Sequence, residues 1–134
     1  MNLFRFEVFT PYRLFFADMV EFVSLTLVDG EIGVLANHCP ITAPVVTCIL
    51  HIKNKDGIAR NAFISSGILE VTEIKTVLMV DTAEWPEEID TERAAAAGQE
   101  ARKDLETAML KFEFDKAKDK IRRSDFRIKV ANMG

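Results

Sequence analysis

The stretch "IDTERA" (Ile89–Ala94) marks the point where strand-like sequence gives way to helix-like sequence. Before it, residues 3–80 contain short runs in which apolar and polar residues alternate, a period of two that is typical of β-strands. After it, alanine and leucine recur every three or four residues, which is typical of an amphipathic helix. The change of period predicts two domains, residues 1–84 and residues 85–134.

The N-terminal part is predicted to form a β-sandwich or flattened barrel. In "LFRFEVF", Phe4, Phe6 and Val8 share one face of a strand. Further strand-like runs follow, separated by turn signals such as "NKDG", in which Gly57 supplies the positive φ of a hairpin tip. Many short strands with regular turns are typical of sandwiches and barrels. The two prolines of "ANHCPITAPV" (36–45) predict an extended loop.

The C-terminal part contains two stripes of small apolar residues. They comprise Ala94, Ala97, Ala101, Leu105, Ala108 and Phe112, and then Phe114, Ala117, Ile121, Ser124, Ile128 and Ala131. Such stripes bury little surface alone, so each helix needs the other as its partner. Acidic side chains predominate in residues 85–110 and basic ones in residues 111–134, which favours an antiparallel hairpin.

The turn between the two helices carries no signal. The sequence "AMLKFEFDKA" (108–117) has no Gly, Pro, Asn or Ser, so a hairpin, one long bent helix, and a switch between them are all open. Gly98 lowers helix stability by about 1 kcal/mol relative to Ala. We therefore expect a marginal helical pair that is able to move.

Composition excludes several classes of protein and site. A net charge of −4 argues against nucleic-acid binding, which requires a basic face. No apolar run approaches the roughly 20 residues of a membrane-spanning helix, and "MNLFRFEVFT" lacks the pattern of a secretory signal. Two cysteines, Cys39 and Cys48, fit a reducing compartment. We expect a protein of the cytoplasm, or of the matching face of a membrane.

No motif in the sequence predicts catalysis or a metal site. Cys48 and His51 are three residues apart on a predicted strand, so their side chains should point to opposite faces and not bind one ion. There is no nucleophile–base arrangement and no phosphate-binding loop rich in glycine. We therefore predict no catalytic residues and no metal ligands.

Asp90 and Arg93 of "IDTERA" have two interpretations. In the first, Asp90 only caps the helix, which contributes about 1 kcal/mol, and Arg93 is solvated. In the second, an antiparallel hairpin brings Arg123 and Arg127, which are spaced i,i+4, towards Arg93. Three guanidinium groups and a carboxylate would then hold a phosphate-bearing ligand through bidentate contacts.

Four segments, in this order, resemble the epsilon subunit of bacterial F-type ATP synthases over essentially the full chain. They are "VFTPYRLFF" (8–16), "GEIGVLANHCPI" (30–41), "SSGILEV" (65–71) and "IDTERA". The second is similar to the family's Gly-Glu-x-Gly-x-Leu-x-x-His-x-Pro block, and the last to the Ile/Leu-Asp-x-x-Arg-Ala start of its helical hairpin. The resemblance implies a ten-stranded β-sandwich followed by an antiparallel two-helix hairpin.

The resemblance also implies a non-catalytic rotor component that requires no cofactor and lies at the cytoplasmic face of the cell membrane. Its sandwich would contact the gamma subunit and the membrane c-ring, with Glu31 and His38 as interface candidates. Its helices would permit turnover when folded. When extended, they would reach the catalytic alpha and beta subunits and block ATP hydrolysis.

In some family members, ATP binds the folded hairpin as a regulatory ligand. The matching positions in this sequence are Glu84, Ile89, Asp90, Arg93, Arg123 and Arg127. Glu100 departs from the pattern, because members that bind ATP can carry an arginine in this region, and a carboxylate repels phosphate. The sequence therefore leaves ATP binding open.

Two other function classes are alternatives to the rotor subunit. A free-standing adaptor that senses nucleotide would have the same domains but no tight partner in the gamma subunit. A small β-sandwich enzyme would show turnover by the isolated chain, which we do not expect.

Overall fold

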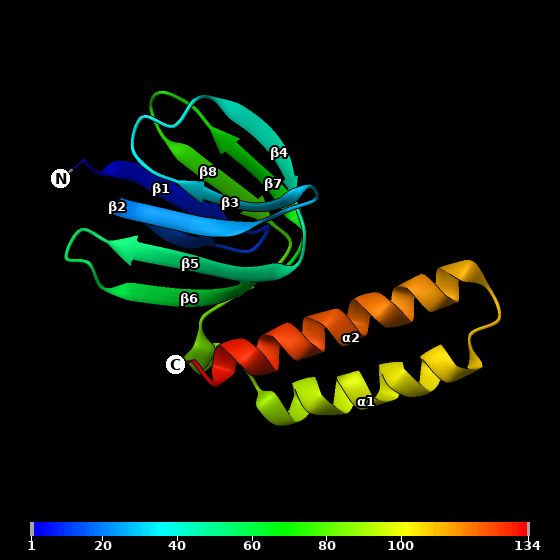
Figure 1. Ribbon diagram of the computed structural model, residues 1–134. Helices are drawn as coiled ribbons and strands as arrows, with labels where there is room; N and C mark the ends of the chain where they lie inside the picture. The colour runs from blue at the N-terminus through cyan, green and yellow to red at the C-terminus, as the bar shows by residue number, and fades with distance from the viewer. Residues whose placement is uncertain (1, 134) are drawn as a thin grey trace. The chain divides into compact units, whose positions relative to one another are not determined.

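A computed structural model describes residues 2–133 and divides the chain into two compact units, Met1–Glu84 and Trp85–Gly134 (Figure 1). The first unit is built of strands and the second of helices. The predicted class, a β-sandwich followed by a helical hairpin, is confirmed. The strand count differs, because the described residues form nine strands instead of ten.

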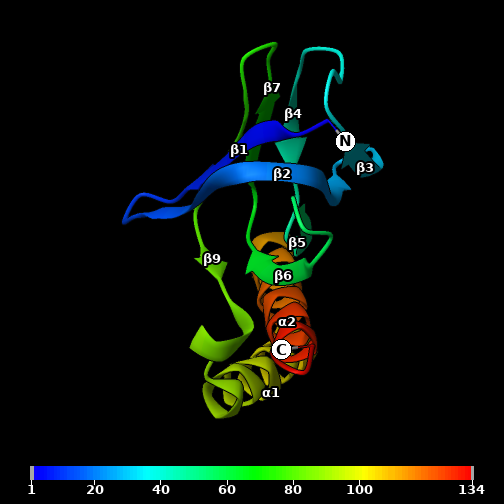
Figure 2. The ribbon, with the colours of Figure 1, turned by 90° about the vertical axis from the view of Figure 1, so that its left-hand side faces the viewer.

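The first unit is a strongly curved sheet that closes on itself. Its strands are β1 (Phe4–Phe9), β2 (Leu14–Leu27), β3 (Gly30–Val34), β4 (Ile41–Val45), β5 (Cys48–Asn54), β6 (Ala59–Ile64), β7 (Gly67–Val71), β8 (Thr76–Val80) and β9 (Ala83–Glu84). They are arranged in the order β1-β8-β7-β4-β2-β5-β6-β9, and β3 pairs with β2. Because β1 also pairs with β2, the strands β1, β8, β7, β4 and β2 form a ring. In Figure 2, β1 and β2 run side by side, as do β7 and β4.

The long strand β2 changes phase part-way along its length. Its pairing with β5 shifts register between Val20 and Phe22, which is a β-bulge. Val20 is fully buried before the bulge, and Val23 and Leu25 are buried after it. One extra residue moves the apolar positions to the other parity. This explains why "VEFVSLTLV" alternates irregularly in the sequence.

The core of the first unit contains the apolar face predicted for the first strand. Phe6 and Val8 are fully buried, although Phe4 is only half-buried. Cys48 is buried and His51 is exposed, which confirms that these two side chains point to opposite faces. Burial raises the pKa of the Cys48 thiol.

The loop predicted over residues 36–45 is shorter than expected, because Ile41–Val45 form strand β4. This strand contains Pro44, which has no N–H to donate. Strand β4 pairs with β7 along its whole length, but its pairing with β2 is confined to Leu27 opposite Val45, so Pro44 is tolerated on the side of β4 that faces β2, where few ladder hydrogen bonds are made. The Pro44 carbonyl still accepts a hydrogen bond from the amide of Val28 at 3.2 Å.

The second unit begins with a short 3-10 helix, η1 (Pro86–Glu88), followed by α1 (Thr91–Thr107) and α2 (Lys111–Ala131). The two α-helices run antiparallel (Figure 1). Residues Ala108–Leu110 connect them, and the backbone is extended at both Ala108 and Leu110. Leu110 makes no side-chain cap hydrogen bond. Of the three alternatives left open by the sequence, the structure shows the hairpin.

The predicted apolar stripes are partly correct. Ala94, Ala101, Ala117 and Ser124 are buried, together with Gly98 and Val130, which the stripes did not include. Phe112 and Phe114 are 68% and 42% exposed, so their assignment was wrong. Because α1 ends at Thr107, Phe112 does not continue its stripe, and both phenylalanines lie in the first turn of α2.

Glu7 of β1 forms ion pairs on both sides of its carboxylate. Its Oε1 accepts a hydrogen bond from Lys75 Nζ at 3.0 Å, and its Oε2 accepts one from Arg5 Nε at 3.2 Å. The hydrogen bond from Lys75, followed by that from Arg5, lowers the pKa of Glu7 below its usual value. The Lys75 pair links β1 to the turn that precedes β8.

The substitution Glu7→Gln should reduce the acid sensitivity of the sandwich. A lowered folded-state pKa contributes stability that is present above the unfolded-state pKa, about 4.3, and is lost as pH falls through the folded-state pKa. We expect the urea midpoint of the unsubstituted protein, followed through sandwich amide signals, to fall more steeply in acid than that of the variant. The two curves should converge at low pH. Parallel curves for Glu7→Gln would contradict this, and Glu70→Gln, at an exposed site, is the control.

Candidate functional site

Two predicted arginines lie at a hollow of about 280 Å³ on the helical hairpin. Its α1 side comprises Ala94, Ala97, Glu100, Ala101 and Asp104, and its α2 side comprises Lys120, Arg123, Ser124 and Arg127. The alanine side chains of α1 are short, so they leave open space above this helix. The volume is near the lower end for small-molecule sites, about 300 Å³.

The start of α1 behaves as the first interpretation of "IDTERA" predicted. Asp90 is the N-cap, and its Oδ1 accepts a hydrogen bond from the amide of Arg93 at 3.1 Å. Arg93 is exposed and does not line the hollow, although the next residue, Ala94, does. The structure therefore confirms the cap and places the Arg93 side chain outside the hollow.

The two remaining residues of the predicted nucleotide site lie before α1. Ile89 is half-buried at the end of η1, and its amide donates to the Pro86 carbonyl at 3.3 Å. Glu84 belongs to the first unit, where it pairs with Phe63 in the β6–β9 ladder. Neither residue lines the hollow between the helices.

The hollow has one wall of each charge. Lys120, Arg123 and Arg127 of α2 form a cationic wall, which faces Glu100 and Asp104 of α1. An anion that enters would be attracted by three cations and repelled by two carboxylates. The hollow therefore suits a ligand with a strongly anionic part, and Glu100 and Asp104 should weaken the binding of that part.

Lys120 is a residue of this site that the sequence reasoning missed. It lies three residues before Arg123 and seven before Arg127, a spacing that places all three on one side of a helix. Arg123 also forms an ion pair within α2, because its Nε is 3.1 Å from Oδ2 of Asp119. The helical spacing of basic residues was the available signal for Lys120.

The ion pair across the hairpin has the opposite polarity to the one expected from the charges of the two helices. Arg102 of α1 donates to Asp125 of α2 at 2.9 Å, so the basic partner comes from the acidic helix. Both side chains are about half exposed, and such surface pairs contribute about 0–1 kcal/mol. Arg102 does not line the hollow.

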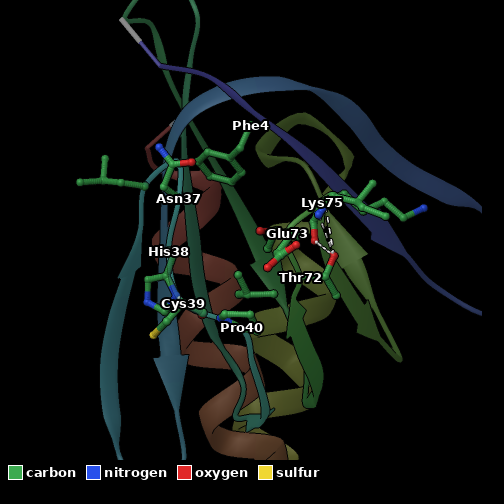
Figure 3. A pocket seen from close by; sticks show the side chains of 12 residues that line it. Phe4, Asn37, His38, Cys39, Pro40, Thr72, Glu73 and Lys75 are labelled. Carbon is green, nitrogen blue, oxygen red and sulfur yellow. Dashed lines mark hydrogen bonds between the residues drawn. The ribbon is translucent and has the colours of Figure 1, made fainter.

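A second hollow, of about 400 Å³, lies in the first unit (Figure 3). Asn37, His38, Cys39 and Pro40 line one side, and the residues around the β7–β8 turn line the other. That turn is held by Thr72, whose hydroxyl donates to the Lys75 carbonyl at 2.9 Å.

The two predicted interface residues of the sandwich lie in different places. His38 lines the second hollow, and its Nδ1 is 2.7 Å from the Cys39 carbonyl. Glu31 is exposed on β3, opposite Thr26 of β2, and does not line this hollow. The structure therefore brings His38, but not Glu31, to the hollow.

Within residues 2–133, no three His, Cys, Asp or Glu side chains are grouped so that they could hold a metal ion. No helix in that part of the chain combines the length and the hydropathy needed to span a membrane.

Comparison with known proteins decides the family. The model of the "ATP synthase, Delta/Epsilon chain, beta-sandwich domain" matches residues 3–86, which contain all the strands described above. The chain belongs to the ATP synthase epsilon chain family. A relative named ATP synthase epsilon chain from Caldicellulosiruptor bescii is 44% identical over 98% of this chain and 95% of its own length. One from Caldanaerobacter subterraneus is 41% identical over 96% and 94%.

Epsilon family members are non-catalytic subunits of ATP synthase, which confirms the resemblance and the absence of an enzymatic role. Solved structures show the same fold. A chain of the Euglena gracilis mitochondrial ATP synthase superposes with a TM-score of 0.83 at 20% identity, covering 100% of this chain and 83% of that one. A chain of the Tetrahymena thermophila enzyme gives 0.65 at 12% identity, with 95% of each chain covered.

Proposed function

We propose that the chain is a central-stalk (rotor) subunit of an F-type ATP synthase, peripheral to the cytoplasmic face of the cell membrane. In this role its sandwich binds the gamma subunit and the c-ring, and its hairpin regulates ATP hydrolysis. The epsilon family supports the proposal, as do fold neighbours from assemblies titled "OSCP/F1/c-ring" and "central stalk/cring". The observation that carries it is an exposed apolar row on the sandwich.

This row crosses four adjacent strands. Phe9 of β1 pairs with Met79 of β8, Met79 with Ile68 of β7, and Ile68 with Pro44 of β4. Residues in register share one face of a sheet. Phe9, Ile68 and Met79 are 37%, 46% and 46% exposed, and Pro44 is exposed as well.

The residues of the row lie together on the outer face of the sheet and are not scattered over the surface. The adjacent positions Val8, Leu78 and Leu69 are in the same register and fully buried, so they form the inner face. Contiguous apolar side chains on an outer face mark a binding surface for another protein. In a rotor subunit, the tightly bound gamma subunit is the partner that would cover it.

The substitution Ile68→Asp should weaken binding to the gamma subunit at least tenfold, because it places a carboxylate in the middle of a buried apolar contact. Titration of gamma with the purified protein would measure this. Ile58→Asp is the matched control, since Ile58 is 60% exposed but follows the β5–β6 turn, outside the row. Equal affinities for the two variants would exclude the row as the gamma surface.

Co-purification with gamma also separates the rotor subunit from the free-standing adaptor. The rotor proposal requires gamma to bind the sandwich tightly, whereas the adaptor needs only the hairpin. If gamma does not bind the unsubstituted chain, the adaptor becomes the better proposal.

The rotor proposal also needs a surface for the c-ring. We assign this contact to the loop that carries His38 and to Glu31 of β3.

The hairpin is suited to regulation because its two helices share few large side chains. The buried residues of α1 are Ala94, Gly98 and Ala101, which gain little from burial. A ligand that binds only the folded hairpin would stabilise it by RT ln(1 + [L]/Kd). ATP would then set the fraction of subunits whose helices are free to extend towards the alpha and beta subunits.

The proposed ATP site combines the hollow with the start of α1. Arg123, Arg127 and Lys120 would bind phosphate oxygens, for which guanidinium groups are well shaped. Arg93 would approach from the preceding turn, and Asp90 would accept from an amino or hydroxyl group. Ile89 and Glu84 are assigned to this site by the family pattern.

The substitution Arg127→Ala should weaken ATP binding about tenfold or more, because it removes a charge-assisted contact from the cationic wall. Isothermal titration calorimetry on the isolated protein would measure the change. Arg122→Ala is the control, because Arg122 is a neighbouring arginine of α2 that does not line the hollow. Unchanged affinity in Arg127→Ala would remove the hollow from the ATP site.

The substitution Glu100→Gln should have the opposite effect and tighten ATP binding. The variant keeps the shape of the side chain and removes one of the two carboxylates that face the cations. We expect a gain of several-fold that decreases as salt is added, because screening weakens the repulsion it relieves. An unchanged affinity for ATP at low salt would show that Glu100 does not face the phosphates.

A further inference from the structure

We infer that Gly98 of α1 and Ser124 of α2 form a latch that holds the two helices together and assembles the hollow between them. Both residues belong to the second unit, and their contact depends on no other part of the chain. Only its ATP-binding consequence, given last, rests on the proposed function.

The first observation is the close approach of the helices at Gly98. Gly98 is buried, and a Cβ atom at this position would lie 2.4 Å from Ser124 Oγ and 3.0 Å from Ser124 Cβ. Carbon atoms in contact are about 3.5–4.0 Å apart. Ser124 therefore occupies the space that a side chain at residue 98 would need.

The second observation is a buried hydrogen bond between the same segments. The Ser124 hydroxyl donates to the Ala94 carbonyl of α1 at 2.7 Å, and Ser124 is only 3% exposed. A serine inside a helix often bonds to its own backbone, but here the acceptor belongs to the other helix. Ser124 therefore both fills the space above Gly98 and joins the two backbones.

The latch is important because the rest of the interface is weak. The other buried residues of the hairpin include Ala94, Ala101 and Ala117, and the Arg102–Asp125 pair is exposed to solvent. Opening at this point would return the Ser124 hydroxyl to water and separate α1 from the residues that flank Ser124.

The same contact builds the hollow. Ala94 and Ser124 both line it, and Arg123 and Arg127 are carried on α2 beside Ser124. When Ser124 is seated over Gly98, the cationic wall stands opposite α1. When the helices separate, the residues of α1 and α2 that line the hollow no longer face each other.

The latch reverses the effect that the sequence predicts for Gly98. Helix propensity alone predicts that Gly98→Ala makes the hairpin more ordered. The contact predicts that it opens the hairpin, because the new methyl group meets Ser124. The two predictions differ in sign, and α2 is the place to measure them, since the substitution does not alter its sequence.

The test is hydrogen exchange of α2 amides in residues 120–127 of the full chain. We expect Gly98→Ala to lower their protection roughly tenfold, the scale of overpacking by one methyl group. Gln99→Ala, at an exposed neighbouring position of α1, should leave it unchanged. Sandwich amides, which should not change, serve as the internal reference.

A second background isolates the contact from other effects of the substitution. In Ser124→Gly, a methyl group at residue 98 no longer meets Ser124 and approaches only the flexible end of Arg102, whose Nη1 would lie 3.2 Å away, so adding Gly98→Ala should cost α2 little further protection. A loss of the same size in both backgrounds, or no loss in either, would overturn the latch.

The ATP-binding consequence is measured separately. If ATP binds only the closed hairpin, Gly98→Ala should weaken it by the factor by which it depopulates that state. If the unsubstituted protein binds no ATP, the proposed ATP site fails, and the exchange result still decides the latch.

Discussion

The sandwich depends on strand β2, which pairs with β1 along its first half and with β3 and β5 along its second. One strand can serve both sets of partners because the bulge at Glu21 turns its apolar positions from one parity to the other. Val20 and Val23 are then both buried, although they are three residues apart. With the ring closed in this way, the outer face of β1, β8, β7 and β4 has a fixed register. The apolar row on that face follows from this register.

Much of the fold could be predicted from local pattern, and what failed depended on partners distant in the sequence. The change of period near residue 85 and the positive φ of Gly57, which is 77° in the structure, are properties of short segments. The strand at Pro44 was not visible, because a proline is tolerated there only since the pairing of β4 with β2 makes few hydrogen bonds. The end of α1 was not visible either, since Ala108–Leu110 contains only residues that favour helices.

The candidate site shows the same division. The Asp90 cap involves residues three apart and could be predicted from sequence. The grouping of Arg123 and Arg127 followed from helical spacing, and Lys120 would have followed from the same spacing. Gly98 was assigned a destabilising role, because its intrinsic propensity is poor and its partner, Ser124, was unknown. The sign of its effect depends on an atom on the other helix, which no local rule includes.

The parallel pairing of β1 with β8 gives the two units different folding speeds. Phe6 lies beside Thr76, so closing the ring brings together residues about seventy positions apart in the sequence, and sheets with such distant pairings form slowly. The hairpin joins residues that are close in sequence, and helical contacts of this kind form in microseconds to milliseconds. Once opened, the second unit can therefore re-form quickly, whereas a sandwich that has unfolded re-forms slowly. The sequence separation of the contacting residues therefore gives one chain a unit that forms slowly and a unit that forms quickly.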